Sequence, residues 1–201
     1  VASPILCAGI TVYTPLVRAG VTKGSKVGVA GVGGLGMFAV QIAKAMGADV
    51  YALTRSASKV DELKAIGCTE VILTNDPENL KPYQGKLDCI IDTISAPHDL
   101  NALLALLTTF GSIGLVGASP EPLNFATFAL VVGGRQIFGS LIGSIEDTQK
   151  VLDLCAEHKI TVPVEVIKPE YINTAYERLV KSDVHYRFAL DIQALKDLKI
   201  E

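Results

Sequence analysis

Short apolar runs alternate with segments of helical spacing along most of the chain. In five segments apolar residues recur three and four positions apart, which predicts helices over residues 34–46, 59–66, 100–107, 125–132 and 145–158. Six shorter runs have the near-continuous apolar character of buried strands: Lys26–Ala30, Asp49–Thr54, Glu70–Leu73, Lys86–Thr93, Gly111–Gly117 and Gln136–Ile142. The pattern therefore predicts strands that are mostly separated by helices.

This alternation indicates the fold class. Strands joined by helical crossovers pair in parallel, and their continuous apolar runs indicate burial on both faces of the sheet. With right-handed crossovers, six such strands are typical of the doubly wound dinucleotide-binding architecture. We therefore predict an α/β protein with a doubly wound six-stranded parallel sheet, the Rossmann fold.

The two ends of the chain differ from its middle. Residues 1–18 precede the first strand and predict a helix, while residues 164–167, 172–181 and 186–192 predict a strand, a helix and a second strand. We predict three parts: a helix in residues 1–20 that borders another domain, a nucleotide-binding domain in 21–163, and a C-terminal segment in 164–201 that returns toward that other domain. Since the chain begins Val-Ala-Ser without Met, we expect a fragment of a longer polypeptide.

Composition and charge narrow the possible partners. The chain has 201 residues, 49% of them apolar, and a net charge of −3. Such a composition excludes a disordered chain. Neither a basic patch nor a run of Lys and Arg is present, which argues against nucleic-acid or membrane-surface partners. No apolar run approaches the roughly 20 residues of a membrane-spanning helix, and no signal-peptide pattern is present.

The four cysteines indicate a reducing compartment. Cys7, Cys68, Cys89 and Cys155 are scattered and form no CxxC pair, so a disulfide scaffold is not expected. We therefore predict a cytoplasmic protein. We interpret Cys68, Cys89 and Cys155 as thiols in the core or near the surface.

The residues Gly31-Val32-Gly33-Gly34-Leu35-Gly36 follow the first strand and open a helix. In this setting the first glycine of G-x-G-x-x-G permits a tight turn, the second lets a pyrophosphate approach the backbone, and the third allows close packing of helix and strand. The amide groups at the start of the helix face the phosphates. The motif predicts dinucleotide binding; the alternative is a glycine-rich turn without a ligand.

The end of the second strand distinguishes between the two nicotinamide cofactors. NAD-binding sites place an Asp or Glu there to hold the ribose 2′-hydroxyl. The stretch after this strand contains no carboxylate before Asp61, and it offers basic and hydroxyl side chains to a 2′-phosphate: Thr54, Arg55, Ser56, Ser58 and Lys59. We predict NADP(H). The alternative is that Arg55 and Lys59 are solvated charges and that Ser56 caps the next helix.

Several separated segments resemble one family. The stretches CAGITVYTPL (7–16), GVGGLG (31–36), TRSASK (54–59), DTISAPHDL (92–100), GSLIGS (139–144) and VHYRFALDI (184–192) occur in this order. Together they resemble the zinc-dependent medium-chain dehydrogenases/reductases, in particular their cinnamyl alcohol dehydrogenase-like branch. The resemblance covers nearly the whole chain.

The resemblance implies a role for Cys7 as one ligand of the catalytic Zn²⁺. Alone, a cysteine on an apolar helix is most often a small core residue. The family's other ligands lie in an N-terminal catalytic domain that this sequence does not include, and one cysteine cannot hold a catalytic zinc. None of His98, His158 and His185 stands at an expected ligand position; His98 reads as a residue at a helix start.

The resemblance also implies further cofactor contacts. It places Thr11 near the nicotinamide and its ribose, Leu35 behind the nicotinamide ring, and Thr93 on the ribose side. It assigns carboxamide-binding backbone groups to two triplets, Val116, Gly117 and Ala118, and Ser140, Leu141 and Ile142. It implies that Arg187 pairs with the pyrophosphate; the alternative for Arg187 is an ordinary charge at a strand edge.

For the intact protein, the resemblance implies reversible reduction of aldehydes to primary alcohols with NADPH, with zinc as Lewis acid. One alternative is a zinc-free quinone or enoyl reductase of the same superfamily, and another is a non-catalytic nucleotide-binding module. We expect the isolated chain to be inactive. Its sixth strand should form an exposed sheet edge, and with the resemblance this predicts a homodimer through that strand.

Overall fold

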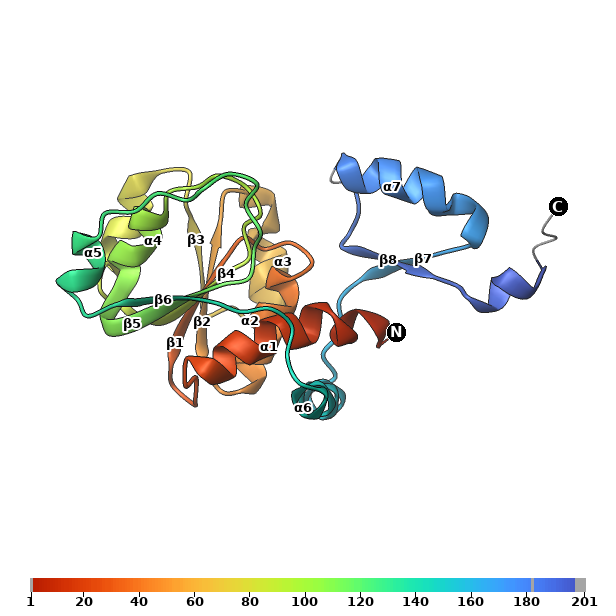
Figure 1. Ribbon diagram of the computed structural model, residues 1–201, viewed down its shortest axis with the longest axis horizontal. Helices are drawn as coiled ribbons and strands as arrows, with labels where there is room; N and C mark the ends of the chain where they lie inside the picture. Colours follow the sequence, from red (N-terminus) through yellow and green to blue (C-terminus); the bar gives the residue numbers. More distant parts are fainter. Residues whose placement is uncertain (1, 182, 198–201) are drawn as a thin grey trace.

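The computed structural model describes residues 2–181 and 183–197, which form an α/β unit and a smaller C-terminal unit beside it (Figure 1). The α/β unit contains one six-stranded sheet with the strand order β3-β2-β1-β4-β5-β6, in which every pair is parallel. The strands are β1 (Lys26–Ala30), β2 (Asp49–Thr54), β3 (Glu70–Leu73), β4 (Leu87–Asp92), β5 (Leu107–Leu115) and β6 (Gln136–Gly139). The predicted fold class is confirmed.

The strand order places a crevice at the centre of the sheet. From β1 the chain continues to β2 and β3 on one side, and it then returns to β4 on the other side of β1. The crossovers after β1 and after β4 therefore leave the sheet in different directions. In open sheets of this kind, ligands bind at the carboxyl ends of the two strands where the order reverses.

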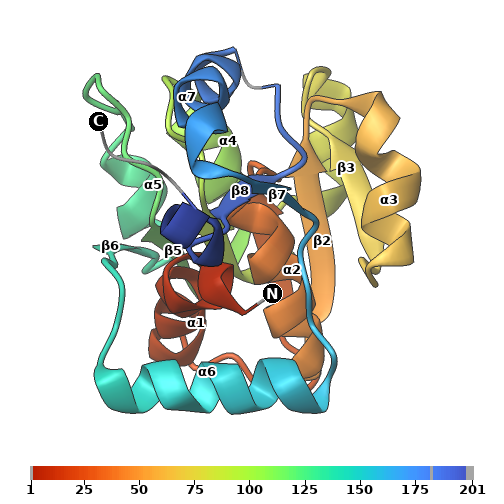
Figure 2. The same ribbon diagram turned by 90° about the vertical axis from the view of Figure 1, so that its right-hand side faces the viewer.

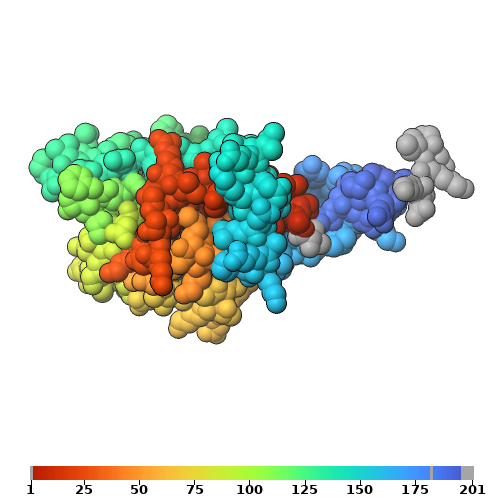
Figure 3. Space-filling view, turned by 90° about the horizontal axis from the view of Figure 1, so that it is seen from below, coloured from red at the N-terminus to blue at the C-terminus, as the bar shows by residue number. Residues whose placement is uncertain are grey.

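Apolar side chains on the two faces of the sheet form separate core clusters. Val29 and Ile91 belong to the first cluster, whereas Ala30 and Ile90 belong to the second, as the two-residue period of a strand requires. The first face carries α1 (Ala8–Arg18), α2 (Gly36–Ala45), α3 (Val60–Ala65) and α6 (Ile145–Glu157). The second carries the 3₁₀ segment Pro77–Tyr83, α4 (Leu100–Leu106) and α5 (Phe128–Val131). In the view from below, the residues of α1 and α6 adjoin (Figure 3), and α6 packs against α1 and α2.

The N-terminal helix is shorter than predicted. A 3₁₀ turn, Ser3–Leu6, precedes α1, and Cys7 stands between them at the position that caps α1. Pro4 lies in the first turn of the 3₁₀ segment, where a missing N–H costs little. The region is therefore helical as predicted, but it is divided into a 3₁₀ turn and a shorter α-helix.

The fifth and sixth strands differ from the predicted ranges. β5 begins at Leu107 and not at Gly111. Its pairing with β4 is irregular between Leu107 and Ser112, and Phe110 in this stretch has a φ of +62°. The irregularity lets Thr108 and Thr109 join the strand. β6 ends at Gly139 and not at Ile142. Ile142 has a φ of +52°, a left-handed conformation that turns the chain away from the sheet. Ser140–Ile142 is consequently a loop.

The C-terminal unit is a small βαβ motif. It contains β7 (Val164–Ile167), α7 (Ile172–Val180) and β8 (Arg187–Leu190), and its two parallel strands form a sheet of their own. Arg178 of α7 holds Glu165 of β7 through two hydrogen bonds of 2.6 and 2.9 Å. Viewed from its end, this unit lies above α1 and α2 (Figure 2). The proposed division at residues 20 and 163 stays a prediction.

No helix within residues 2–181 and 183–197 has both the length and the apolar character that crossing a bilayer requires.

Candidate nucleotide-binding site

The three glycines of the predicted motif have different surroundings at the end of β1. Gly31 has a φ of +79°, which favours glycine, and its N–H donates to the Leu53 carbonyl at 3.2 Å. A Cβ on Gly36 would collide with the carbonyl oxygen of Gly31, whereas a Cβ on Gly33 would meet no atom within 4 Å. The backbone of the turn is therefore tightly packed at Gly36, whereas the space beside Gly33 is open. The approach of a phosphate to the backbone requires such an open space.

The helix that follows the turn presents an uncapped N-terminus. α2 is ten residues long, and its capping residue makes no side-chain hydrogen bond to the start of the helix. Leu35 stands at the capping position and packs partly against the first core cluster. The free amide groups of such an end, with the positive end of the helix dipole, favour an anion.

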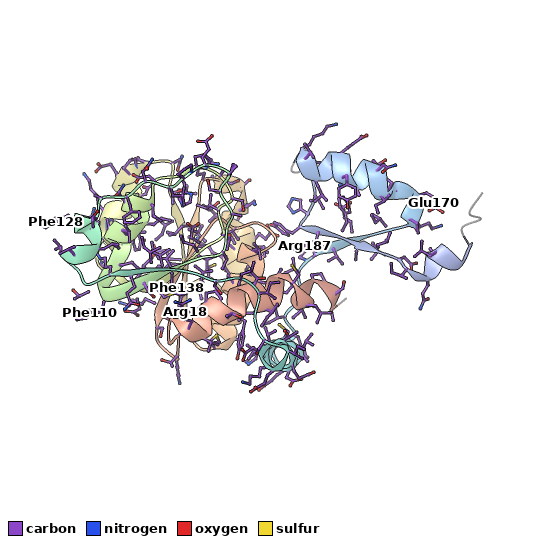
Figure 4. The ribbon with its side chains drawn as sticks, viewed as in Figure 1. Arg18, Phe110, Phe128, Phe138, Glu170 and Arg187 are labelled. Atoms are coloured by element: carbon purple, nitrogen blue, oxygen red, sulfur yellow. The ribbon has the colours of Figure 1, made fainter. Side chains whose placement is uncertain are left out.

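Arg187 lies directly over this turn although it follows in the chain by more than 150 residues. Its Nε would be 3.0 Å from a Cβ on Gly34, so the guanidinium covers the backbone of the turn. Figure 4 shows Arg187 at the start of β8, between the C-terminal unit and the α/β unit. The Nε atom is buried and has no hydrogen-bond partner in the described part of the chain. A buried guanidinium N–H without an acceptor, beside a helix N-terminus, fits a phosphate ligand.

The segment after β2 is joined to the glycine-rich turn by Lys59. Its Nζ donates to the Val32 carbonyl at 2.8 Å. The hydroxyls of Ser56 and Ser58 lie 2.8 Å apart, and Ser56 makes no capping hydrogen bond, which disfavours the alternative that it serves as a helix cap. Thr54 is buried and accepts a hydrogen bond from the Ser56 N–H at 3.2 Å. Arg55 is exposed.

A cavity of about 320 Å³ opens at the carboxyl ends of the central strands. Its lining includes Thr54 at the end of β2 and Arg55 after it, Thr74 after β3, and Ile94 and His98 after β4. The cavity therefore lies where the open-sheet rule places the adenosine half of a dinucleotide.

Sequence reasoning missed a buried acid beside this cavity. Asp92, only 1% exposed, ends β4, and its Oδ2 lies 2.8 Å from Nε2 of His98. Burial raises the pKa of Asp92, while the Ile94 N–H and His98 oppose this shift. The only signal in the sequence was an acid that ends an apolar run, followed six residues later by a histidine.

The loops after β4 and β5 meet at the same edge of the sheet. Thr93 donates to the carbonyls of Ala30, at 3.1 Å, and of Gly31. The N–H groups of Val116 and Gly117 donate to the Asp92 carbonyl at 2.9 and 3.0 Å, and Ala118 donates to Ser95 Oγ at 3.3 Å. The structure thus places Thr93 against the glycine-rich turn and the Val116–Ala118 loop against the end of β4 and the loop that follows it.

Two further groups of predicted residues lie outside this cluster of contacts. The Ser140 N–H continues the sheet by donating to the Leu115 carbonyl at 3.0 Å, but Leu141 after it is 87% exposed and Ile142 is exposed as well. Thr11 is buried in α1. Their roles toward a cofactor stay predictions.

Cys7 is exposed, so it is not the core residue that its apolar surroundings allowed. Across residues 2–181 and 183–197, no three His, Cys, Asp or Glu side chains are grouped closely enough to hold a metal ion. The other cysteines are buried, which raises the pKa of Cys89 to about 12 and those of Cys68 and Cys155 to about 11. The described residues therefore do not form a zinc site by themselves.

The chain is similar to known dehydrogenases. Residues 34–157 match the family model described as zinc-binding dehydrogenase. A probable formaldehyde dehydrogenase of Bacillus subtilis is 46% identical over 97% of this chain and 56% of its own length. The chain thus spans about half the length of the curated relatives it matches.

Solved structures that resemble this chain are also dehydrogenases. A cinnamyl alcohol dehydrogenase of Sorghum bicolor has a TM-score of 0.90 and 43% identity over 96% of this chain and 55% of its own. A Helicobacter pylori cinnamyl alcohol dehydrogenase complexed with NADP(H) has a TM-score of 0.83 and 40% identity, over 94% of this chain and 54% of its own. Because the family model covers more than half of the chain, and these relatives match nearly all of it, the chain belongs to the zinc-binding dehydrogenases and is cinnamyl alcohol dehydrogenase-like.

Proposed function

We propose that this chain is the NADP(H)-binding part of a zinc-type alcohol dehydrogenase that reversibly reduces aldehydes to primary alcohols by hydride transfer. The observation that carries the proposal is the buried Nε of Arg187, which lies over Gly34 at the open side of a glycine-rich turn and has no hydrogen-bond partner among the described residues. The dehydrogenases that the chain resembles, one of them solved with NADP(H), support the same function.

The pyrophosphate would bind between Gly33 and Arg187. Gly33 leaves the backbone accessible, and the positive end of the α2 dipole favours an anion there. Arg187 supplies the balancing charge and gains the acceptor that its Nε lacks. These groups bind parts that NADP(H) and NAD(H) share, so they provide affinity without distinguishing the two cofactors.

The 2′-phosphate would bind after β2. Lys59 holds its ammonium at the mouth of the turn, Ser56 and Ser58 present hydroxyls, and Arg55 lines the neighbouring cavity. No carboxylate stands between Thr54 and Asp61 to repel the additional phosphate. The cavity beside Thr54 would take the adenine.

The nicotinamide half would lie along the loops that follow β4, β5 and β6. We assign its contacts to Thr93, to the Val116–Ala118 loop and to the Ser140–Ile142 loop, with Thr11 and Leu35 nearby. When bound, the cofactor supplies the hydride. The role of this chain is to hold the nicotinamide ring at a fixed distance and angle to the substrate.

Cys7 would be one zinc ligand, with the remaining ligands outside this chain. Its exposure at the start of α1 leaves it accessible to another domain. A catalytic zinc needs three protein ligands, so we expect neither zinc binding nor aldehyde reduction by this chain alone. A zinc-free reductase and a non-catalytic nucleotide module remain the alternatives; relatives named as alcohol dehydrogenases favour the proposed activity.

Fluorescence titration of the 201-residue chain with NADPH and NADH tests the cofactor assignment. We expect NADPH to bind about tenfold more tightly, because the 2′-phosphate adds charge-assisted hydrogen bonds. Tighter binding of NADH would contradict the assignment, and no binding of either cofactor would contradict the nucleotide site as a whole.

We also propose that the whole protein is cytoplasmic and forms a homodimer through β6. The unpaired edge of β6 supports the dimer. Cysteines without disulfides support the compartment.

A further inference from the structure

Tyr186 is a buried side chain that the cofactor contacts proposed above do not use. It immediately precedes β8, is 9% exposed, and packs in the core cluster on the side of α1, α2 and α3. Its hydroxyl donates a hydrogen bond to the carboxylate of Glu62 on α3. The ammonium of Lys59 lies 5.4 Å from the centre of its ring, within reach of a cation–π contact.

Lys59 and Glu62 are three residues apart, at the start of α3. An acid and a lysine at this spacing are neighbours on a helix surface and commonly pair. Here they do not: among the described residues no ion pair joins Lys59 to any carboxylate. Lys59 donates to the Val32 carbonyl at 2.8 Å, while Glu62 accepts from Tyr186.

The arrangement leaves the ammonium of Lys59 beside the proposed phosphate site with its charge not neutralised. Its contacts are a carbonyl oxygen and the face of an aromatic ring, both of which attract a cation without cancelling its charge. An ammonium has three donors, and the carbonyl of Val32 uses one of them. Two donors remain for an anion.

We propose that Tyr186 is a positioning residue for NADP(H) preference: by holding the Glu62 carboxylate, it keeps Glu62 from pairing with Lys59 and leaves Lys59 free for the 2′-phosphate. The inference rests on the proposed function. The next residue, Arg187, covers the pyrophosphate side of the same turn. The start of β8 therefore serves both phosphate sites of one cofactor through two consecutive side chains.

The test is Tyr186→Phe in the 201-residue chain, which retains the ring and removes only the hydroxyl. Glu62, released from its donor, then pairs with Lys59. We expect NADPH to bind about fivefold more weakly, which corresponds to the net contribution of about one hydrogen bond, and NADH to bind as in the wild type. Tyr176→Phe is the matched control, because Tyr176 is an exposed tyrosine on α7. Circular dichroism checks that each variant is folded.

The double variant Tyr186→Phe/Glu62→Gln separates positioning from packing. Glutamine carries no charge to neutralise Lys59, so we expect the double variant to regain the wild-type ratio of NADPH to NADH affinity. Unchanged NADPH binding in Tyr186→Phe, equal weakening of both cofactors, or a double variant as weak as the single one would each overturn the inference while leaving the proposed function intact. A wild-type chain that does not prefer NADPH would overturn both.

Discussion

Single atoms distinguish the glycines of the turn after β1. A Cβ on Gly36 would overlap the backbone oxygen of Gly31 in the same turn, whereas the same atom on Gly33 would meet no described atom within 4 Å. The requirement for glycine at position 36 is therefore internal packing. At position 33 no neighbour among the described residues requires glycine, and we attribute the requirement to the proposed pyrophosphate.

Alanine substitutions at these two positions should separate folding from binding. We expect Gly36→Ala to destabilise the chain by about 2 kcal/mol, as overpacking does, and Gly33→Ala to leave stability within about 0.5 kcal/mol of the wild type. We expect Gly33→Ala to weaken NADPH and NADH alike, because its methyl group occupies the approach to the shared pyrophosphate. Urea unfolding and cofactor titration measure the two effects. Wild-type cofactor affinity in Gly33→Ala would place the pyrophosphate elsewhere.

At the scale of elements, α6 shows how a local contact determines where a helix begins. The chain leaves β6 at Gly139, turns at Ile142, and starts α6 after Ser144. The hydroxyl oxygen of Ser144 accepts the Asp147 N–H at 3.0 Å and donates to the Asp147 carboxylate at 2.8 Å. Val151 on the inner side of α6 then packs into the first core cluster. The cap thus fixes where α6 begins, and the helix then packs against α1 and α2.

Removing this cap should have a measurable cost. We expect Ser144→Ala to reduce the free energy of unfolding by about 1 kcal/mol, with Ser144→Thr close to the wild type. Ser140→Ala is a suitable control, because the Ser140 hydroxyl makes no hydrogen bond to the described residues. Urea denaturation provides the comparison. Equal stabilities of Ser144→Ala and Ser140→Ala would show that the cap contributes nothing.

At the scale of the whole molecule, apolar side chains gather at one end of the sheet. Phe110 and Phe128 are 78% and 72% exposed, and Figure 4 shows them at the same end of the α/β unit. The Phe110 N–H donates to the Gly133 carbonyl at 2.7 Å, between α5 and β6, which places these side chains beside the unpaired edge. A strand edge next to apolar side chains is a typical surface for a second copy.

The proposed homodimer can be tested by charging this end of the molecule. We expect the 201-residue chain to sediment as a dimer and Phe128→Glu to shift it to monomer, because a carboxylate is costly to bury without a partner. Ile145→Glu is the control: Ile145 is also highly exposed, but it lies on α6. Analytical ultracentrifugation distinguishes the species. A wild-type monomer at all concentrations would argue against the dimer for this chain.

The sequence by itself determined the order of strands and helices, the parallel sheet and the glycine-rich turn. These depend on local periodicity and on residues that lie next to one another, as in Gly31–Gly36. Its errors lie where tertiary contacts decide the boundary, such as the end of β6, where Ile142 leaves the sheet in a left-handed conformation.

The tertiary structure alone decided which side chains meet around the turn. Lys59 reaches a carbonyl 27 residues away, and Tyr186 reaches Glu62 across 124 residues. The pairing of Asp92 with His98 was equally hidden, because nothing in the spacing showed that the buried Asp92 carboxylate contacts a histidine that lines the cavity. A one-dimensional pattern records the period of an element. Which faces of distant elements come together is decided by packing, and the proposed NADP(H) preference depends on that packing.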